Sequence, residues 1–327
     1  MKTNEFTKRD VQREALEAEK RIKGFVRETS LEHDLFLSQL GNCHVFLKLE
    51  NLQLTGSFKL RGAFNKLLTL TARERETGVI TASSGNHGAA FTYAAKKLGY
   101  HGVVVVPENV SPAKLDILRL YGAEPVFHGT DVADTETFAR QMAKKQGKAF
   151  ISPYNDPMII AGQATVGIEI MNQLETIDAV FVPVGGGGLM SGIAGYMKSR
   201  NGKIRLIGCQ PGNSPVMYES VKAGRIVQME SKPTMADGSA GGIEEGSITF
   251  PICRDCVDEY ILVSEEEIKA AIRLVLDKSF MLIEGAAALS VACFLKEKER
   301  FKNKNVVLVI SGKKISMDKL KNIICEV

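Results

Sequence analysis

Six short runs of the chain are apolar at nearly every position, without the alternation of a half-exposed strand. They cover residues 45–49, 78–82, 103–106, 179–184, 204–209 and 306–310. Such runs are typical of strands buried on both faces. Longer segments with spaced apolar residues predict helices over residues 58–70, 89–98, 113–120, 135–145, 160–173 and 265–277. Because strands that alternate with helices form parallel sheets, the pattern predicts an α/β fold.

Three of the predicted strands end in loops rich in glycine and small polar residues. The loops are residues 83–88, 185–188 and 311–312. Ligands of parallel α/β sheets bind beyond the carboxyl ends of the strands. We therefore expect these loops to form one composite site.

Composition narrows the class of protein. The chain has 327 residues, enough for one large or two medium domains, and 44% of them are hydrophobic. A net charge of +4 lacks the basic excess of a nucleic-acid-binding protein. The polar N-terminus has no apolar signal core, and no uncharged stretch is long enough to span a bilayer, so we expect a cytoplasmic protein.

The six cysteines are scattered and several lie in apolar runs, which predicts buried free thiols of a reducing compartment. Cys253 and Cys256 have the spacing of a zinc-binding pair. A structural zinc site needs a second pair, and the sequence has none, so we predict no metal.

Four consecutive glycines, residues 185–188, lie between a predicted strand and a predicted helix start. Their N–H groups can wrap a phosphate at the positive end of the helix, whereas a plain turn needs only one glycine. The dinucleotide-binding fingerprint requires glycine where Met190 or Ser191 stands, and no Walker A pattern exists. The run predicts a cradle for a single phosphate and argues against a nicotinamide oxidoreductase.

Lys59 follows a turn at the start of the helix predicted over residues 58–70. A helix N-terminus disfavours a cation, so a desolvated lysine there would lose its proton readily and serve as an amine nucleophile. By position alone, a solvated surface lysine is the commoner case.

Residues 83–87 offer hydroxyls, an amide and an imidazole near another helix start. They suit a substrate carboxylate or a cofactor hydroxyl. A structural alternative is that Ser84 or Asn86 caps the helix predicted to begin near Gly88. His87 is either a catalytic base or, as lone histidines more often are, a structural residue.

A resemblance to a known family rests on five motifs in a fixed order. They are residues 57–63 (SFKLRGA), 83–88 (SSGNHG), the tetraglycine, 284–286 (EGA) and 311–312 (SG). Together they resemble the serine/threonine dehydratase and serine racemase family of pyridoxal-phosphate enzymes, which are of fold type II and tryptophan-synthase β-like. The resemblance extends from about Glu32 to the C-terminus.

The resemblance implies two three-layer α/β domains with mostly parallel sheets. A small domain, residues 52–153, would be inserted into a large pyridoxal-phosphate-binding domain formed by residues 1–51 and 154–327. The resemblance also implies a homodimer that acts on a small amino acid.

It further implies a role for each motif. Lys59 would form the Schiff base with pyridoxal 5'-phosphate, and Phe58 would pack against the ring. The other implied cofactor contacts are Gly185, Gly186, Gly187 and Gly188 to the phosphate, Asn86 to the ring hydroxyl and Ser311 to the pyridine nitrogen. Ser83, Ser84, Gly85 and His87 would line the substrate carboxylate.

These roles imply dehydration of threonine or serine to a 2-oxo acid and ammonia, with Lys59 as the base. Serine racemisation is an alternative, with Ser84 acting from the opposite face, and another hydroxy-amino acid such as 3-hydroxyaspartate is a further possible substrate. An idle vitamin-binding or regulatory protein is disfavoured, because Lys59 and the carboxylate loop are both present.

The sequence departs from the family at two places. Lys313 and Lys314 stand where the family often has Gly-Asn, beside Ser311. Residues 210–216 lack the carboxylates that hold a divalent cation in mammalian-type serine racemases, so we expect that metal site to be absent or weak.

Overall fold

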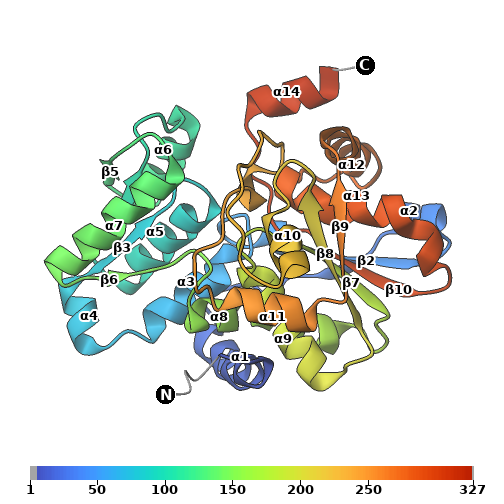
Figure 1. Ribbon diagram of the computed structural model, residues 1–327, viewed down its shortest axis with the longest axis horizontal. Helices are drawn as coiled ribbons and strands as arrows, with labels where there is room; N and C mark the ends of the chain where they lie inside the picture. The colour runs from blue at the N-terminus through green and yellow to red at the C-terminus, as the bar shows by residue number, and fades with distance from the viewer. Residues whose placement is uncertain (1–5, 326–327) are drawn as a thin grey trace.

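The computed structural model describes residues 6–325, and these form two β-sheets (Figure 1). The larger sheet has the strand order β1-β2-β10-β7-β8-β9, and every pairing except that of β1 with β2 is parallel. The smaller sheet has four parallel strands in the order β5-β4-β3-β6. The predicted α/β class with mostly parallel sheets is confirmed.

The larger sheet and its helices are built from both ends of the chain. Before residue 59 the elements are α1 (Lys8–Ile22), β1 (Leu31–His33), α2 (Leu35–Gly41), β2 (His44–Lys48) and the 3-10 helix η1 (Glu50–Leu52). After residue 150 they are α8 (Pro157–Gln173), β7 (Ala179–Pro183), α9 (Gly188–Arg200), β8 (Arg205–Pro211), α10 (Val216–Ala223), η2 (Asp237–Ser239), α11 (Thr249–Cys256), β9 (Glu259–Val263), α12 (Glu265–Lys278), α13 (Gly285–Glu297), η3 (Lys298–Phe301), β10 (Asn305–Val309) and α14 (Met317–Cys325).

The smaller sheet is built from one continuous segment between them. Its elements are α3 (Lys59–Leu68), α4 (Ala72–Thr77), β3 (Val79–Ala82), α5 (Asn86–Leu98), β4 (Gly102–Val106), α6 (Pro112–Leu120), β5 (Pro125–Phe127), α7 (Val132–Gln146) and β6 (Ala149–Phe150). All six predicted strands are present, as β2, β3, β4, β7, β8 and β10, with ends shifted by at most two residues. The six predicted helices are α3, α5, α6, α7, α8 and α12.

Each central strand sends alternate side chains into two separate cores. In β7, Ala179 and Phe181 contribute to a core with α12 and α13, whereas Val180 and Val182 contribute to a core with α1, α8 and α9. β4 divides in the same way between α5 on one face and α7 on the other. A pleated strand covered on both faces needs apolar residues at every position, which explains the unbroken apolar runs.

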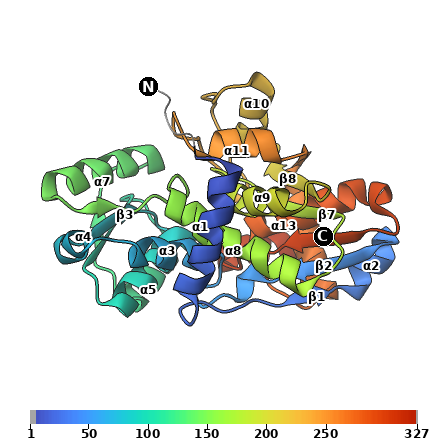
Figure 2. The same cartoon turned by 90° about the horizontal axis from the view of Figure 1, so that it is seen from below.

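Helix ends follow local sequence signals. α8 begins at Pro157 because Asp156 before it accepts the N–H groups of Met158 and Ile159. Figure 2 shows α1 lying across α8, and it packs against both α8 and α9. Within residues 6–325, no helix is both long and apolar enough to cross a bilayer.

Candidate active site

Lys59 is the first residue of α3, and its side chain is half-buried. Its Nζ donates a hydrogen bond to the carbonyl oxygen of Pro153 (2.8 Å) and lies 5.3 Å from the centre of the Phe58 ring. Burial lowers the pKa of the ammonium to about 8, although the carboxylate of Glu284 favours the charged form. Lys59 is therefore an amine that loses its proton near neutral pH, and it is not a solvated surface lysine.

The loop over residues 83–88 joins β3 to α5. The structural alternative, a cap by Ser84 or Asn86, is wrong: α5 begins at Asn86, its N-cap residue is Gly85, and no side chain caps it. Neither Ser84 nor Asn86 serves as the cap, since Asn86 is already the first residue of the helix. Its amide nitrogen donates to the carboxylate of Glu284. Gly88 permits the tight loop, since a Cβ there would lie 2.0 Å from the carbonyl oxygen of Ser83.

Glu284 is a site residue to which the sequence analysis gave no role, although it opens the EGA motif. It precedes α13 and is 6% exposed. Its carboxylate accepts from Asn86 Nδ2 (2.8 and 2.9 Å) and from the backbone N–H of Lys314 (3.1 Å). Burial raises its pKa to about 7, against the opposing effect of these hydrogen bonds. It is poised to change charge near neutral pH.

His87 lies deeper than its loop neighbours. Its Nε2 is 3.0 Å from the hydroxyl of Thr81, in β3, and 3.3 Å from the carbonyl oxygen of Ile151, which follows β6. Burial, aided by the Lys59 ammonium, lowers its pKa to about 3, so the ring is neutral at physiological pH. These contacts favour the structural interpretation of His87 over that of a base.

The tetraglycine leads from β7 into α9. A Cβ at Gly186 would lie 2.8 Å from ring atoms of Tyr154, and one at Gly185 would lie 2.9 Å from Cα of Ser239. Gly187 has φ 88°, a conformation that favours glycine. The run is thus required by close packing, and it presents the N–H groups at the start of α9, which have no acceptor within their own helix.

Ser311 follows β10 and is 2% exposed. Its carbonyl oxygen accepts the N–H of Phe58 (3.2 Å), which places it beside the start of α3. Lys314, one of the two lysines that stand where the family often has Gly-Asn, lies close to Ser311 in the chain. Its Nζ is buried and has no hydrogen-bond partner among the described residues. Burial lowers the pKa of Lys314 to about 8, although Glu284 favours its charged form.

Backbone and side-chain contacts join the three predicted loops. Glu284 links Asn86 to the last loop, because its N–H donates to the carbonyl oxygen of Gly312 (3.1 Å). Pro153, the acceptor for Lys59, is followed by Tyr154, which packs on Gly186 and Gly188.

Of the cysteines, Cys253 contacts the tetraglycine, because its thiol donates to the carbonyl oxygen of Gly187 (3.9 Å). Those at positions 43, 209, 253, 256 and 293 are buried free thiols, as expected, whereas Cys325 is exposed. In the described part of the chain, no three His, Cys, Asp or Glu side chains gather as a metal ion would require.

A family model described as pyridoxal-phosphate dependent enzyme matches residues 22–312. The chain belongs to this family. An L-threonine ammonia-lyase of Thermotoga maritima is 40% identical over 308 residues, which cover 94% of this chain and 76% of that protein. Threonine deaminase isoform 2 of Solanum lycopersicum matches with a TM-score of 0.92 at 31% identity, covering 98% of this chain and 94% of the other. Maize serine racemase matches with a TM-score of 0.90 at 29% identity and 96% coverage of both chains.

The residues present fit the cofactor of a pyridoxal-phosphate dependent enzyme. Oδ1 of Asn86 is buried and has no partner in residues 6–325, as expected of an acceptor for a ring hydroxyl. The start of α9 offers N–H groups to a phosphate. Lys59 offers an amine of lowered pKa, as covalent attachment to an aldehyde requires.

Proposed function

We propose that this enzyme is an ammonia-lyase that converts L-threonine or L-serine to a 2-oxo acid and ammonia. The observation that carries the proposal is the amine of Lys59, which is half-buried, has a pKa lowered to about 8 and lies near Glu284. The similarity to the L-threonine ammonia-lyase of Thermotoga maritima and to the threonine deaminase of Solanum lycopersicum supports the same reaction.

The groups that would hold the cofactor come from four segments. Lys59 would bond it covalently, with Phe58 against the ring. Asn86 would accept from the ring hydroxyl, and Ser311 would face the ring nitrogen. The phosphate would bind to N–H groups of Gly185, Gly186, Gly187 and Gly188.

Bound pyridoxal phosphate supplies an electron-accepting ring, so that the hydrogen on the substrate's α-carbon can leave as a proton. Lys59 Nζ would accept this proton, since a pKa of about 8 leaves part of the amine neutral at pH 7. The β-hydroxyl leaves with a proton as water, and one water is taken up when the released enamine becomes the 2-oxo acid and ammonia. Ser311 is neutral and, facing the ring nitrogen, would keep the ring a moderate electron acceptor, which would favour prompt loss of the hydroxyl.

Substrate would be held by the loop before α5. Ser83, Ser84 and Gly85 lie in this loop at the N-terminus of a helix, where a carboxylate is favoured. His87 would support the loop from behind, because its Nε2 is already engaged with Thr81 and Ile151.

Serine racemisation is the second candidate function, favoured by the similarity to maize serine racemase. Ser84 would then exchange a proton on the face opposite Lys59. A hydroxy-amino acid such as 3-hydroxyaspartate is a further candidate substrate for the lyase reaction.

We also propose that residues 52–153 form an inserted small domain, because all strands of the smaller sheet lie between residues 79 and 150. We propose a cytoplasmic homodimer, in keeping with the family resemblance and with five buried free thiols, which a reducing compartment preserves.

The test is the absorbance spectrum of the purified protein, followed by assays of 2-oxo acid and D-serine. L-Threonine, L-serine and L-threo-3-hydroxyaspartate are compared, with Lys59→Ala as the control. A visible band and oxo acid formation that depends on Lys59 would support the lyase and rank its substrates. D-Serine without oxo acid would favour the racemase, and no band after adding pyridoxal phosphate would contradict the whole assignment.

A further inference from the structure

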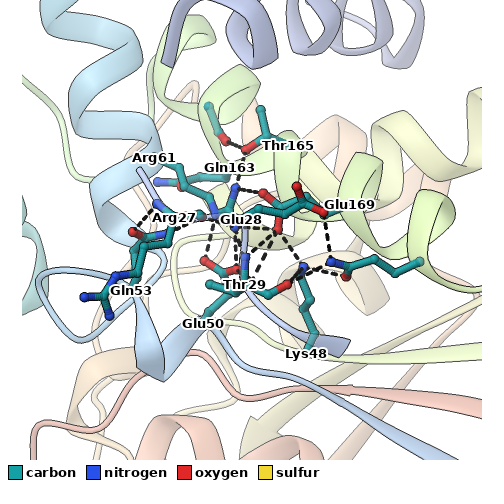
Figure 3. A network of polar contacts seen from close by, with 12 residues as sticks. Arg27, Glu28, Thr29, Lys48, Glu50, Gln53, Arg61, Gln163, Thr165 and Glu169 are labelled. Carbon is teal, nitrogen blue, oxygen red and sulfur yellow. Dashed lines mark hydrogen bonds and ion pairs between the residues drawn. The ribbon is translucent and has the colours of Figure 1, made fainter. Parts of the chain in front are cut away.

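A buried cluster of two cations and two carboxylates lies at the start of α3 (Figure 3). The side chains of Arg61 and Lys48 are 1% and 0% exposed, and those of Glu50 and Glu169 are 0% and 13% exposed. The formal charges cancel. Buried charges are tolerated only where they are paired and fully hydrogen-bonded, and this cluster meets that condition.

Arg61 uses all three guanidinium nitrogens. Nε and Nη2 each donate to one carboxylate oxygen of Glu50, both at 2.8 Å. Nη1 and Nη2 donate to the two carboxylate oxygens of Glu169, at 2.5 and 2.7 Å. A planar fork bound by two carboxylates at once is fixed in both position and angle, which a lysine ammonium could not achieve.

The partners of Arg61 all belong to the body of the larger sheet. Glu50 lies in η1, directly after β2, and Glu169 lies in α8. Lys48, at the end of β2, donates through Nζ to Oε2 of Glu169 (2.6 Å), the oxygen that also accepts from Arg61 Nη2, and to the carbonyl oxygen of Thr29 (2.7 Å). The network therefore fastens the first turn of α3 to the larger sheet, while another face of α3 packs on α5 of the smaller one.

Arg61 and Lys59 leave α3 in nearly opposite directions, because two residues along a helix turn through about 200°. A rotation of α3 that moved the guanidinium would swing the Lys59 amine as well. The same network also holds α8, and the segment just before α8 supplies the Pro153 carbonyl that accepts from Lys59. One set of buried hydrogen bonds thus sets the placement of both the amine and its acceptor.

We propose that Arg61 is a positioning residue for Lys59, acting through Glu50 and Glu169. This inference rests on the proposed role of Lys59 as the amine that bonds the cofactor. The bond forms between Lys59 Nζ and the cofactor's aldehyde carbon with loss of one water, and its rate depends on where the amine is held. The network should therefore control the rate of attachment more than the affinity for the phosphate.

The test uses Arg61→Lys, which keeps the charge and removes the fork. The full-length protein is stripped of cofactor, pyridoxal phosphate is added at saturating concentration, and attachment is followed by absorbance and trapped with borohydride. We expect attachment to slow roughly 10- to 100-fold, as for a reacting group displaced by about 1 Å. Equilibrium binding of inorganic phosphate, which needs no amine, should stay within twofold of the unchanged protein.

Lys66→Met is the matched control. Lys66 also lies on α3 and forms an ion pair with Asp156 before α8 (2.7 Å), but toward the other end of the helix. It should leave the attachment rate unchanged. Glu169→Gln is the second variant: it preserves the side-chain shape, leaves Arg61 paired with Glu50, and should slow attachment by less than Arg61→Lys does.

Attachment at the original rate in a folded Arg61→Lys protein would overturn the proposal, as would equal slowing in Lys66→Met. If Arg61→Lys fails to fold, Glu169→Gln replaces it in the test, and attachment at the original rate in that variant would overturn the proposal. Peptide mapping of the borohydride-trapped protein tests the role of Lys59 separately from that of Arg61. Attachment at a lysine other than Lys59 would refute the proposed role of Lys59, independently of any effect of the Arg61 variant.

Discussion

The amide of Asn86 donates to both carboxylate oxygens of Glu284, with Nδ2 2.8 Å from Oε1 and 2.9 Å from Oε2. Asn86 is the first residue of α5 and Glu284 directly precedes α13, helices that pack on different sheets, so this contact joins the two halves of the site. It also orients the amide, because the nitrogen must face the carboxylate and the oxygen is left for another donor. Glu284 thereby determines what Asn86 can offer to a cofactor.

Glu284→Gln should weaken cofactor binding. A glutamine amide has one acceptor oxygen, so its NH₂ group would oppose the amide nitrogen of Asn86 and disturb its orientation. Loss of a hydrogen bond to a charged group costs about 1.5–3 kcal/mol, which corresponds to an affinity about tenfold lower or more. The dissociation constant is measured by titrating the stripped enzyme with pyridoxal phosphate. Asp237→Asn, at an exposed neighbouring position, is the control, and equal affinities in all three proteins would disprove the role.

Lys314→Met should shift the pH dependence of kcat/KM to higher pH. We expect kcat/KM to rise with pH as Glu284 loses its proton, since its pKa is about 7, whereas Lys59 is bonded to the cofactor in the loaded enzyme and no longer titrates as a free amine. The Lys314 cation favours the charged carboxylate, so its removal should raise the pKa of Glu284 further. The profile is recorded between pH 5.5 and 9.5, both as kcat/KM and as cofactor absorbance.

Lys313→Met is the matched control for that experiment, because Lys313 is adjacent and exposed. Removing either lysine lowers the net charge equally, but only Lys314 has a buried ammonium without a partner in the described residues. Identical profiles for the two variants would show that the buried ammonium has no special effect on Glu284.

The central strands could be predicted from sequence, whereas the edge strands could not. The unpredicted strands β1, β5, β6 and β9 are the outer strands of the two sheets. An edge strand is covered less completely and can be short and polar, as in Leu31–His33, so it leaves no apolar run to detect. The central runs were detectable because burial on both faces leaves no polar position.

The candidate site was predictable only where its chemistry is local. The glycine run and Lys59 each lie at one helix start, and their surroundings follow from a few neighbouring residues. The alternative of a cap at Ser84 or Asn86 was wrong because α5 begins at Asn86, before the predicted start near Gly88, with Gly85 as its N-cap residue. The contact of Asn86 with Glu284 could not be predicted either, because the two residues are far apart in the sequence. Likewise, no spacing rule pairs Arg61 with Glu169, because the two residues meet only through the packing of α3 on α8.

His87→Gln should make the protein's stability less sensitive to acid. Burial lowers the pKa of His87 to about 3, so between pH 6.5 and 3 the unfolded chain binds a proton that the folded one does not. The free energy of unfolding therefore falls by about 1.4 kcal/mol for each pH unit as the pH is lowered through that window. A glutamine has no such proton and can still donate to Thr81 or Ile151.

The check on His87 is the apparent melting temperature at pH 7 and pH 5. At pH 7 the variant should have a lower melting temperature than the original protein. Between pH 7 and pH 5 its melting temperature should fall less, so that the difference between the two proteins becomes smaller at pH 5. His101→Gln, at an exposed position, should follow the original protein at both pH values. A gap that stays constant would mean that His87 does not titrate as its burial implies.

Gly186→Ala should weaken cofactor binding through the ring of Tyr154. The added Cβ would lie 2.8 Å from three ring atoms, so either the ring or the loop must move. Tyr154 is anchored, because its hydroxyl accepts the N–H of Glu244 (2.9 Å), and the loop is therefore the part that shifts. Overpacking of this kind costs about 1–3 kcal/mol, which corresponds to an affinity roughly 5- to 150-fold lower if the cost falls on the bound state.

Gly202→Ala is the control, since a Cβ there meets nothing within 4 Å. Titration with pyridoxal phosphate should separate the two variants, and an unchanged dissociation constant for Gly186→Ala would mean that the cofactor phosphate is held somewhere other than the tetraglycine.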